Sequence, residues 1–187
     1  MGKKTYDFDW SDLDEEFGNS ILSKAETFIK SQLKCSIAQD NRSMQSASIF
    51  MGFSAILFAS SMSFLSSKEP SGIHNNSLIF TIIAMAILFF LSATFCFYSG
   101  KPGLIGLPGN EPKNWWWIKA NDKQSAIGGE LENYQEAIDN NDRELRERAQ
   151  IYLNGIRIAL SAPIIGILIW SLGTYGSKVL NLICSFF

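Results

Sequence analysis

The sequence predicts an all-α integral membrane protein with three transmembrane helices and with cytosolic helices of amphipathic or coiled-coil-like pattern. Three apolar runs without any charged residue, at about residues 44–66, 77–100 and 158–177, are long enough to cross a bilayer as helices. Hydrophobic residues make up 47% of the 187 residues and charged residues 18%, and the two kinds occupy different stretches. Outside the three runs, apolar residues recur at helical spacing, which predicts helices there as well.

Residues 1–19 form an acidic N-terminal tail that also carries aromatic residues. It has no clear periodicity, so we expect either a loosely ordered tail or a short docking segment for a partner. Residues 20–43 follow as a cytosolic amphipathic helix, because Asn19 or Ser20 can cap a helix and an apolar stripe follows. This helix can pack on another cytosolic helix or lie on the inner leaflet. Its stripe consists of Ile21, Leu22, Ala25, Phe28, Ile29 and Leu33.

Residues 44–100 are expected to form a transmembrane hairpin. Asp40 and Arg42 precede it and are polar candidates for a local salt bridge or a polar cap. Small residues share one face of the first span and one face of the third, and small faces allow close helix approach in lipid. We expect these two faces to pack together, or one of them to serve self-association, and we expect the bulkier second span to face lipid. The face of the first span consists of Ser48, Gly52, Ala55 and Ala59. The face of the third span consists of Gly155, Ala159, Ala162 and Gly166.

Residues 101–126 read as an interfacial loop that is rich in glycine, proline and tryptophan. Trp115, Trp116 and Trp117 lie close to the exit of the second span. Indole rings favour the membrane–water interface, so we interpret the three residues as an interfacial anchor. Alternatively, the three tryptophans form a platform for a partner or ligand, or part of a small cytosolic core.

Residues 127–178 are expected to form one long helix that runs from the cytosol through the third span. Its cytosolic part carries a heptad seam, in which polar Asn141 would fix the register. The seam can meet the helix of residues 20–43 or its own copy in an oligomer. Arg157 and Lys178 bracket the span, Asn154 lies at the inner interface, and residues 179–187 form an apolar tail at the outer face. The seam is Ile127, Leu131, Tyr134, Ile138, Asn141, Leu145, Arg148 and Tyr152.

The distribution of lysine and arginine predicts the orientation in the membrane. Most of these residues lie before the first span or between the second and third spans, and cytoplasmic segments carry the excess of positive charge. Only Lys68 and Lys178 lie on the other side, with Arg157 at the boundary. We therefore expect a multi-pass protein of the inner (plasma) membrane with a cytoplasmic N-terminus and an external C-terminus.

The sequence offers no set of residues typical of catalysis. His74 is the only histidine, the cysteines Cys35, Cys96 and Cys184 match no metal-ligand spacing, and no phosphate loop is present. We expect no enzyme activity, no cofactor and no bound metal. The net charge of −2 argues against nucleic acid as a partner. The expected partners are the lipid bilayer, further copies of the chain in a homo-oligomer, and a cytosolic protein.

The layout resembles small multi-pass membrane proteins of bacterial antiphage systems, namely the SLATT-type effectors and the membrane subunit of Kiwa. An amphipathic helix that ends in Asp40-Asn41-Arg42 leads into a two-helix hairpin, a Gly/Pro loop with tryptophans and a further helix. The resemblance implies an oligomeric bacterial membrane effector or sensor whose triggered activation perturbs the envelope. The alternative is a membrane anchor or accessory subunit that recruits a cytosolic partner. The last helix carries Tyr134, Ile138, Asn141, Leu145 and Ala149.

Overall fold

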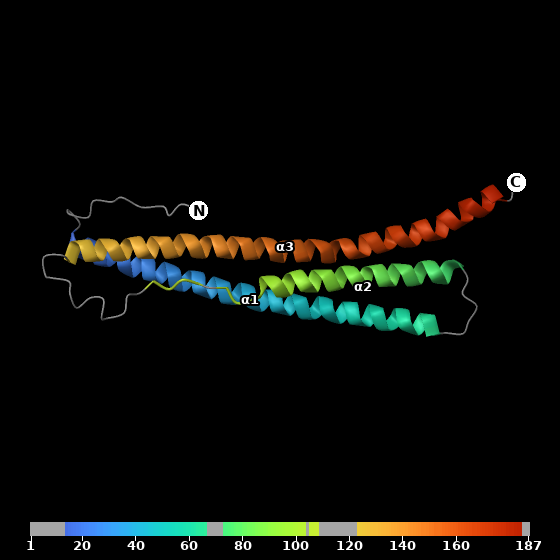
Figure 1. The fold of residues 1–187 in the computed structure, drawn as a ribbon, viewed down its shortest axis with the longest axis horizontal. Helices are drawn as coiled ribbons and strands as arrows, with labels where there is room; N and C mark the ends of the chain where they lie inside the picture. The colour runs from blue at the N-terminus through green and yellow to red at the C-terminus, as the bar shows by residue number, and fades with distance from the viewer. Residues whose placement is uncertain (1–13, 67–72, 104, 109–122, 185–187) are drawn as a thin grey trace. The chain divides into compact units, whose positions relative to one another are not determined.

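In the computed structural model, residues 14–66, 73–103, 105–108 and 123–184 are described, and every regular element among them is an α-helix. Helix α1 spans Glu15–Ser66, α2 spans Ile73–Ser99 and α3 spans Lys123–Cys184 (Figure 1). Each helix contains a segment that is long and apolar enough to cross a membrane. The prediction of a helical protein with three possible membrane spans is therefore confirmed.

Helix α1 begins earlier than the sequence predicted. The backbone N–H of Phe17 donates to Oδ2 of Asp14 at 3.1 Å, so Asp14 caps the helix in place of Asn19 or Ser20. Glu15 and Glu16 in the first turn favour this start, because their charges complement the positive end of the helix dipole.

The boundary that the sequence placed between residues 43 and 44 is not a break in the helix. Helix α1 continues for 52 residues from Glu15 to Ser66. No proline occurs in it, and no glycine lies between Gly18 and Gly52, so nothing local ends the helix at that point. The amphipathic segment and the first span are thus parts of one element.

Helix α3 is also longer than expected and continues through Pro163 to Cys184, so it includes most of the predicted C-terminal tail. Proline lacks the N–H that would bond to the carbonyl of Ala159. The hydroxyl of Ser161 donates to the carbonyl of Ile158 at 2.8 Å, so it does not replace the missing bond to Ala159. The C-terminal part of the helix is bent (Figure 1), and a proline inside a helix is a common cause of a bend.

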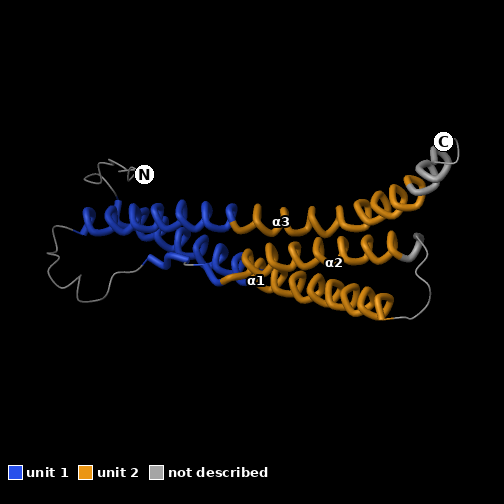
Figure 2. Tube along the Cα trace, turned by 45° about the vertical axis from the view of Figure 1, so that its right-hand side comes forward, with its two compact units in different colours: residues 1–38, 102–147 blue, residues 39–101, 148–187 orange. Residues whose placement is uncertain are grey.

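The chain divides into two compact units (Figure 2). Unit 1 comprises residues 1–38 and 102–147, and unit 2 comprises residues 39–101 and 148–187. Helices α1 and α3 contribute to both units. In unit 1 they run in the same direction, and Glu15 and Lys123 form an exposed ion pair of 3.7 Å near their N-terminal ends.

In unit 2, α2 runs antiparallel to α1 and α3 and packs against both (Figure 2). Its contacts with α1 include a hydrogen bond from Ser54 to the carbonyl of Ala86 at 2.9 Å. Its contacts with α3 include a hydrogen bond from Ser92 to the carbonyl of Gly155 at 2.7 Å. The core between these helices consists of small side chains, with Ala47, Ala86, Ala93, Cys96, Ala159 and Ala162 among its buried members.

Candidate functional site

A buried asparagine joins three segments of unit 1. Asn141 on α3 is only 1% exposed. Its Oδ1 accepts a bond of 2.9 Å from the N–H of Gly106, and its Nδ2 donates to the carbonyl of Gly106 at 3.1 Å and to Oε1 of Gln32 at 3.3 Å. The side chain thus pairs with the backbone of residue 106 as another peptide group would, and it also holds α1 through Gln32. We call Gln32, Gly106 and Asn141 the Asn141 clamp.

The heptad seam of α3 lies toward α1 in unit 1. Its members from Ile127 to Leu145 are all buried or half-buried, whereas most of the residues between them are exposed. Gln32 of α1 is buried beside the seam, and its Nε2 donates to the carbonyl of Ile138 at 3.2 Å. Within one chain, therefore, the seam meets α1, which is one of the two arrangements that the sequence left open.

In unit 2, a buried arginine connects all three helices. The guanidinium of Arg148 on α3 forms an ion pair with Asp40 on α1, and its Nε donates to the carbonyl of Ser99 at the end of α2 at 3.1 Å. The Ser99 hydroxyl donates a hydrogen bond of 2.8 Å to the carbonyl of Arg148. The same hydroxyl lies 3.3 Å from the hydroxyl of Ser43. We call Asp40, Ser43, Ser99 and Arg148 the Arg148 cluster.

The ion pair of the Arg148 cluster is largely removed from water. The side chain of Arg148 is 6% exposed and that of Asp40 is 25% exposed. Burial lowers the pKa of the Arg148 guanidinium, although arginine stays charged throughout the physiological range. The sequence expectation of a local salt bridge at Asp40 differs from this finding, because the partner lies on another helix. Arg42, the other candidate, is exposed.

Buried serines lie in the interior of unit 2 and were missed in the sequence. They lie on α1 and α2, and they bond mostly to the backbone of a neighbouring helix or of their own helix. In lipid, such groups strengthen contacts between helices that the hydrophobic effect does not drive together. A signal was available, because Ser54 and Ser61, and also Ser92 and Ser99, are seven residues apart on one helix face. The buried members are Ser43, Ser54, Ser61, Ser92 and Ser99.

The small face of the third span packs on α2 and not on the first span. A β-carbon at Gly155 would lie 2.9 Å from Sγ of Cys96 and 3.2 Å from the carbonyl oxygen of Ser92, so the two helices approach closely there. Gly166 faces Met85 of α2, and Ala159 is buried. The second span packs against α3 on one face, while most of the phenylalanines for which it is expected to face lipid are exposed. Its contact with lipid stays a prediction.

The small face of the first span is exposed in the single chain. Gly52 has no neighbouring atom within 4 Å of a β-carbon, and Ser48, Ala55 and Ala59 are exposed. The structure therefore differs from the expected packing of this face against the third span. Its alternative use in self-association stays a prediction.

The remaining candidate residues lie as follows. Arg157 is exposed, and its Nη1 donates to Oδ1 of half-buried Asn154 at 3.4 Å. The three tryptophans Trp115, Trp116 and Trp117 lie outside the described residues, and so does the side chain of Lys178. Their predicted place at the membrane interface stays a prediction, as do the expected absences of a cofactor and of enzyme activity.

Comparison of the chain with protein-family models, with curated proteins and with solved structures found no match. The candidate site is therefore defined by geometry alone. Two polar centres, the Asn141 clamp and the Arg148 cluster, each join segments that are distant in the sequence. Neither contains a nucleophile with an adjacent base, and both are arranged to hold helices in register.

Proposed function

We propose that this chain is a membrane-embedded effector or sensor of the bacterial inner membrane, acting in antiphage defence. Unit 1 receives a signal in the cytoplasm, and the spans of unit 2 then repack and perturb the membrane. The proposal is supported by the continuity of α1 and α3, since each helix carries residues of unit 1 and of unit 2 without a break. A turn or shift of either helix in unit 1 would be passed along its own backbone.

The single observation that carries this proposal is the Arg148 cluster. A buried ion pair is weak evidence for stability, because the cost of removing two charges from water offsets much of their attraction. In some proteins a buried pair instead selects one arrangement of the chain over another, and we propose that role here. Arg148 contacts α1 and α2 from α3, just outside the apolar spans, where it can hold the resting packing of all three helices.

A buried donor beside the cluster supports two alternative packings. Nε2 of Gln39 is buried and has no hydrogen-bond partner among the described residues. Such a group costs about 1–3 kcal/mol. A second arrangement of α1 that gives this donor an acceptor would recover that free energy. This donor is therefore one cost of the resting packing that a second arrangement would relieve.

Self-association completes the proposed mechanism. The exposed small face of α1, with Gly52 and Ala55 at its centre, is free to meet the same face of a second copy. Faces of this kind bring transmembrane helices close together. In this proposal the resting oligomer is closed, and repacking of its spans after the trigger opens or distorts the bilayer.

The experiment that tests the function is phage challenge of bacteria that make the full chain, with membrane potential followed by a voltage-sensitive dye. We expect the potential to stay intact before infection and to collapse after infection by a phage that supplies the trigger, with fewer phage progeny. An unchanged potential and undiminished progeny across a broad phage panel would contradict a role as effector.

The second candidate function is a membrane anchor that recruits a cytosolic protein. It is favoured by two phenylalanines of α1 in unit 1, since Phe17 is 59% exposed and Phe28 is 51% exposed. Exposed aromatic side chains are common anchors in protein–protein interfaces. If this function holds, Phe28→Ser will abolish capture of one defined partner from the host, whereas Lys34→Ser, at an exposed position of the same helix, will not.

A further inference from the structure

A groove opens between α1 and α2 on the surface of unit 2. It has a volume of about 430 Å³, which lies in the range of small-molecule sites. Met44, Ser48 and Met51 of α1 line it on one side, and Ala93, Thr94 and Phe97 of α2 line it on the other. The groove follows the first turns of the first span and the last turns of the second, so in a membrane it lies at one end of both spans.

The groove offers an apolar wall in spite of its two hydroxyl groups. The Ser48 hydroxyl donates to the carbonyl of Met44 at 3.0 Å, and the Thr94 hydroxyl donates to the carbonyl of Phe90 at 2.9 Å. Both hydroxyls are thus satisfied within their own helices. The flexible side chains of Met44 and Met51 can adapt to an irregular apolar guest. The lining therefore suits a hydrocarbon chain and offers little to a polar ligand.

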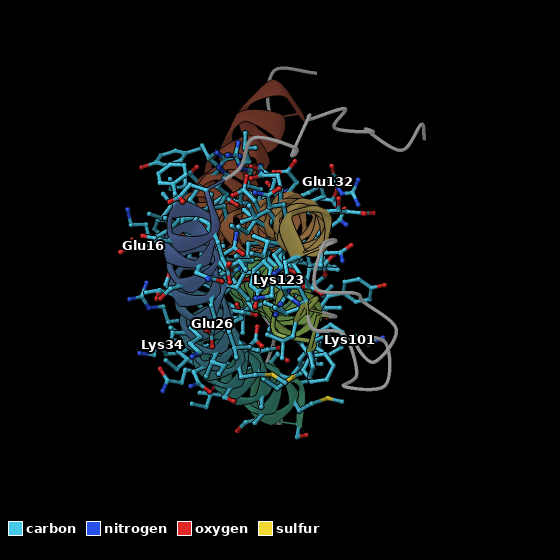
Figure 3. All side chains as sticks on the ribbon, turned by 90° about the vertical axis from the view of Figure 1, so that its left-hand side faces the viewer. Glu16, Glu26, Lys34, Lys101, Lys123 and Glu132 are labelled. Carbon is cyan, nitrogen blue, oxygen red and sulfur yellow. The ribbon has the colours of Figure 1, made fainter. Side chains whose placement is uncertain are left out.

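A lysine follows Gly100, the residue on which Met44 at one end of the groove packs. Met44 packs on Gly100, because a β-carbon at Gly100 would lie 3.2 Å from Cγ of Met44. Lys101 follows Gly100 directly, is exposed and forms no ion pair among the described residues. Figure 3 shows the labelled Lys101 at the outside of the helices. Basic residues at the cytoplasmic end of a groove between spans attract anionic lipid head groups.

We propose that this groove binds one anionic phospholipid of the bilayer, with an acyl chain between α1 and α2 and the phosphate head group at Lys101. The apolar lining selects a hydrocarbon chain, and the charge of Lys101 selects the head group. The inference rests on the placement of α1 and α2 in a membrane and not on the proposed signalling role, so the two can fail separately.

The test is lipid retention by the purified full chain, counted by native mass spectrometry after exchange into detergent with equal amounts of phosphatidylglycerol and phosphatidylcholine. We expect about one retained lipid per chain and a preference for phosphatidylglycerol of about fivefold, the factor that corresponds to about 1 kcal/mol for one lysine near an anionic surface. Lys101→Gln should keep the bound lipid and lose the preference. Ser48→Phe, which fills the groove, should lose the lipid.

Ala55→Phe is the matched control. Ala55 is exposed, lies one heptad after Ser48 on the same face of α1 and does not line the groove. Any effect of phenylalanine on self-association is shared by the two variants, whereas loss of lipid is expected only at Ser48. The proposal is overturned if the wild-type chain retains no lipid or shows no preference. It is also overturned if Ser48→Phe retains lipid as Ala55→Phe does, or if a second copy of the chain occupies the groove.

Discussion

At the scale of single residues, two buried polar side chains explain how the helices are held in register. Asn141 pairs with both backbone groups of Gly106 and with Gln32, so it satisfies its amide with groups from two other segments. Arg148 likewise bonds to two other helices, through its ion pair with Asp40 and its hydrogen bond to the carbonyl of Ser99. The heptad pattern drew attention to Asn141, but nothing in the sequence pairs Arg148 with Asp40, because their separation of 108 residues is bridged only by the fold.

Replacement of Asn141 by leucine should destabilise the chain. A polar residue in a heptad seam ordinarily lowers stability, but here Gln32 and Gly106 would lose their hydrogen-bond partner if Asn141 were replaced. We expect a loss of about 2 kcal/mol in the free energy of unfolding, measured by circular dichroism in detergent. Asn140→Leu, at the exposed neighbouring position, should change it by less than about 0.5 kcal/mol. Equal effects of the two variants would contradict the clamp.

Removal of one partner of the ion pair should cost more than removal of both. Asp40→Leu alone leaves Arg148 buried without its carboxylate, so we expect a loss of about 3 kcal/mol, which is toward the lower end for buried pairs because Asp40 is partly exposed. Asp40→Leu combined with Arg148→Met should recover most of that loss. Thermal unfolding of Asp40→Leu, of Arg148→Met and of the double variant measures this cycle. Additive losses would show that the two side chains do not interact.

At the scale of helices, the most hydrophobic residues of the spans are not the most buried ones. In water the two coincide, but in lipid an apolar side chain is as well placed on the outside, and small or hydroxyl-bearing residues fill the inside. The pattern of apolar residues therefore located the spans and did not reveal which faces pack. In the first span, Ile56 is exposed, whereas Ser54 and Ser61 are buried.

The two glycines Gly155 and Gly52 provide a matched test of helix packing. A leucine at Gly155 would collide with Cys96 and with the backbone of Ser92, so Gly155→Leu should destabilise the contact of α2 with α3 by about 1–3 kcal/mol. The same substitution at Gly52 meets no neighbour and should leave the unfolding temperature of the monomer unchanged. If Gly52→Leu also lowers the oligomeric state, measured by cross-linking in membranes, the exposed face of α1 is the contact between copies.

At the scale of the whole molecule, the proposed function depends on how the chain lies in the membrane. Length and composition were sufficient to predict three spans, because these properties are local to each segment. The orientation rests on the distribution of lysine and arginine, which only a measurement in cells can test. Charged residues such as Glu16 and Lys34 project outward from α1 in unit 1, consistent with water around it (Figure 3).

The natural cysteines can test the orientation. Cys35 is exposed on α1 before the first span, and Cys96 is buried in unit 2. If the N-terminus is cytoplasmic, a membrane-impermeant thiol reagent should label Cys35 only after the cells are made permeable, and Cys96 only after unfolding. The third cysteine, Cys184, should be labelled in intact cells, because the C-terminus is expected outside. Labelling of Cys35 in intact cells would reverse the orientation.

The proposed function requires that the ion pair of Arg148 and Asp40 hold the spans in their resting arrangement. The most direct test is the membrane potential of uninfected bacteria that make Asp40→Asn, compared with wild type and with Asp142→Asn at matched levels of folded protein. Asp142 forms an exposed pair of 2.8 Å with Arg146, so its loss is a control for removing a surface charge. We predict that Asp40→Asn lowers the potential without infection, while wild type and Asp142→Asn do not. A normal potential in all three strains would contradict the claim.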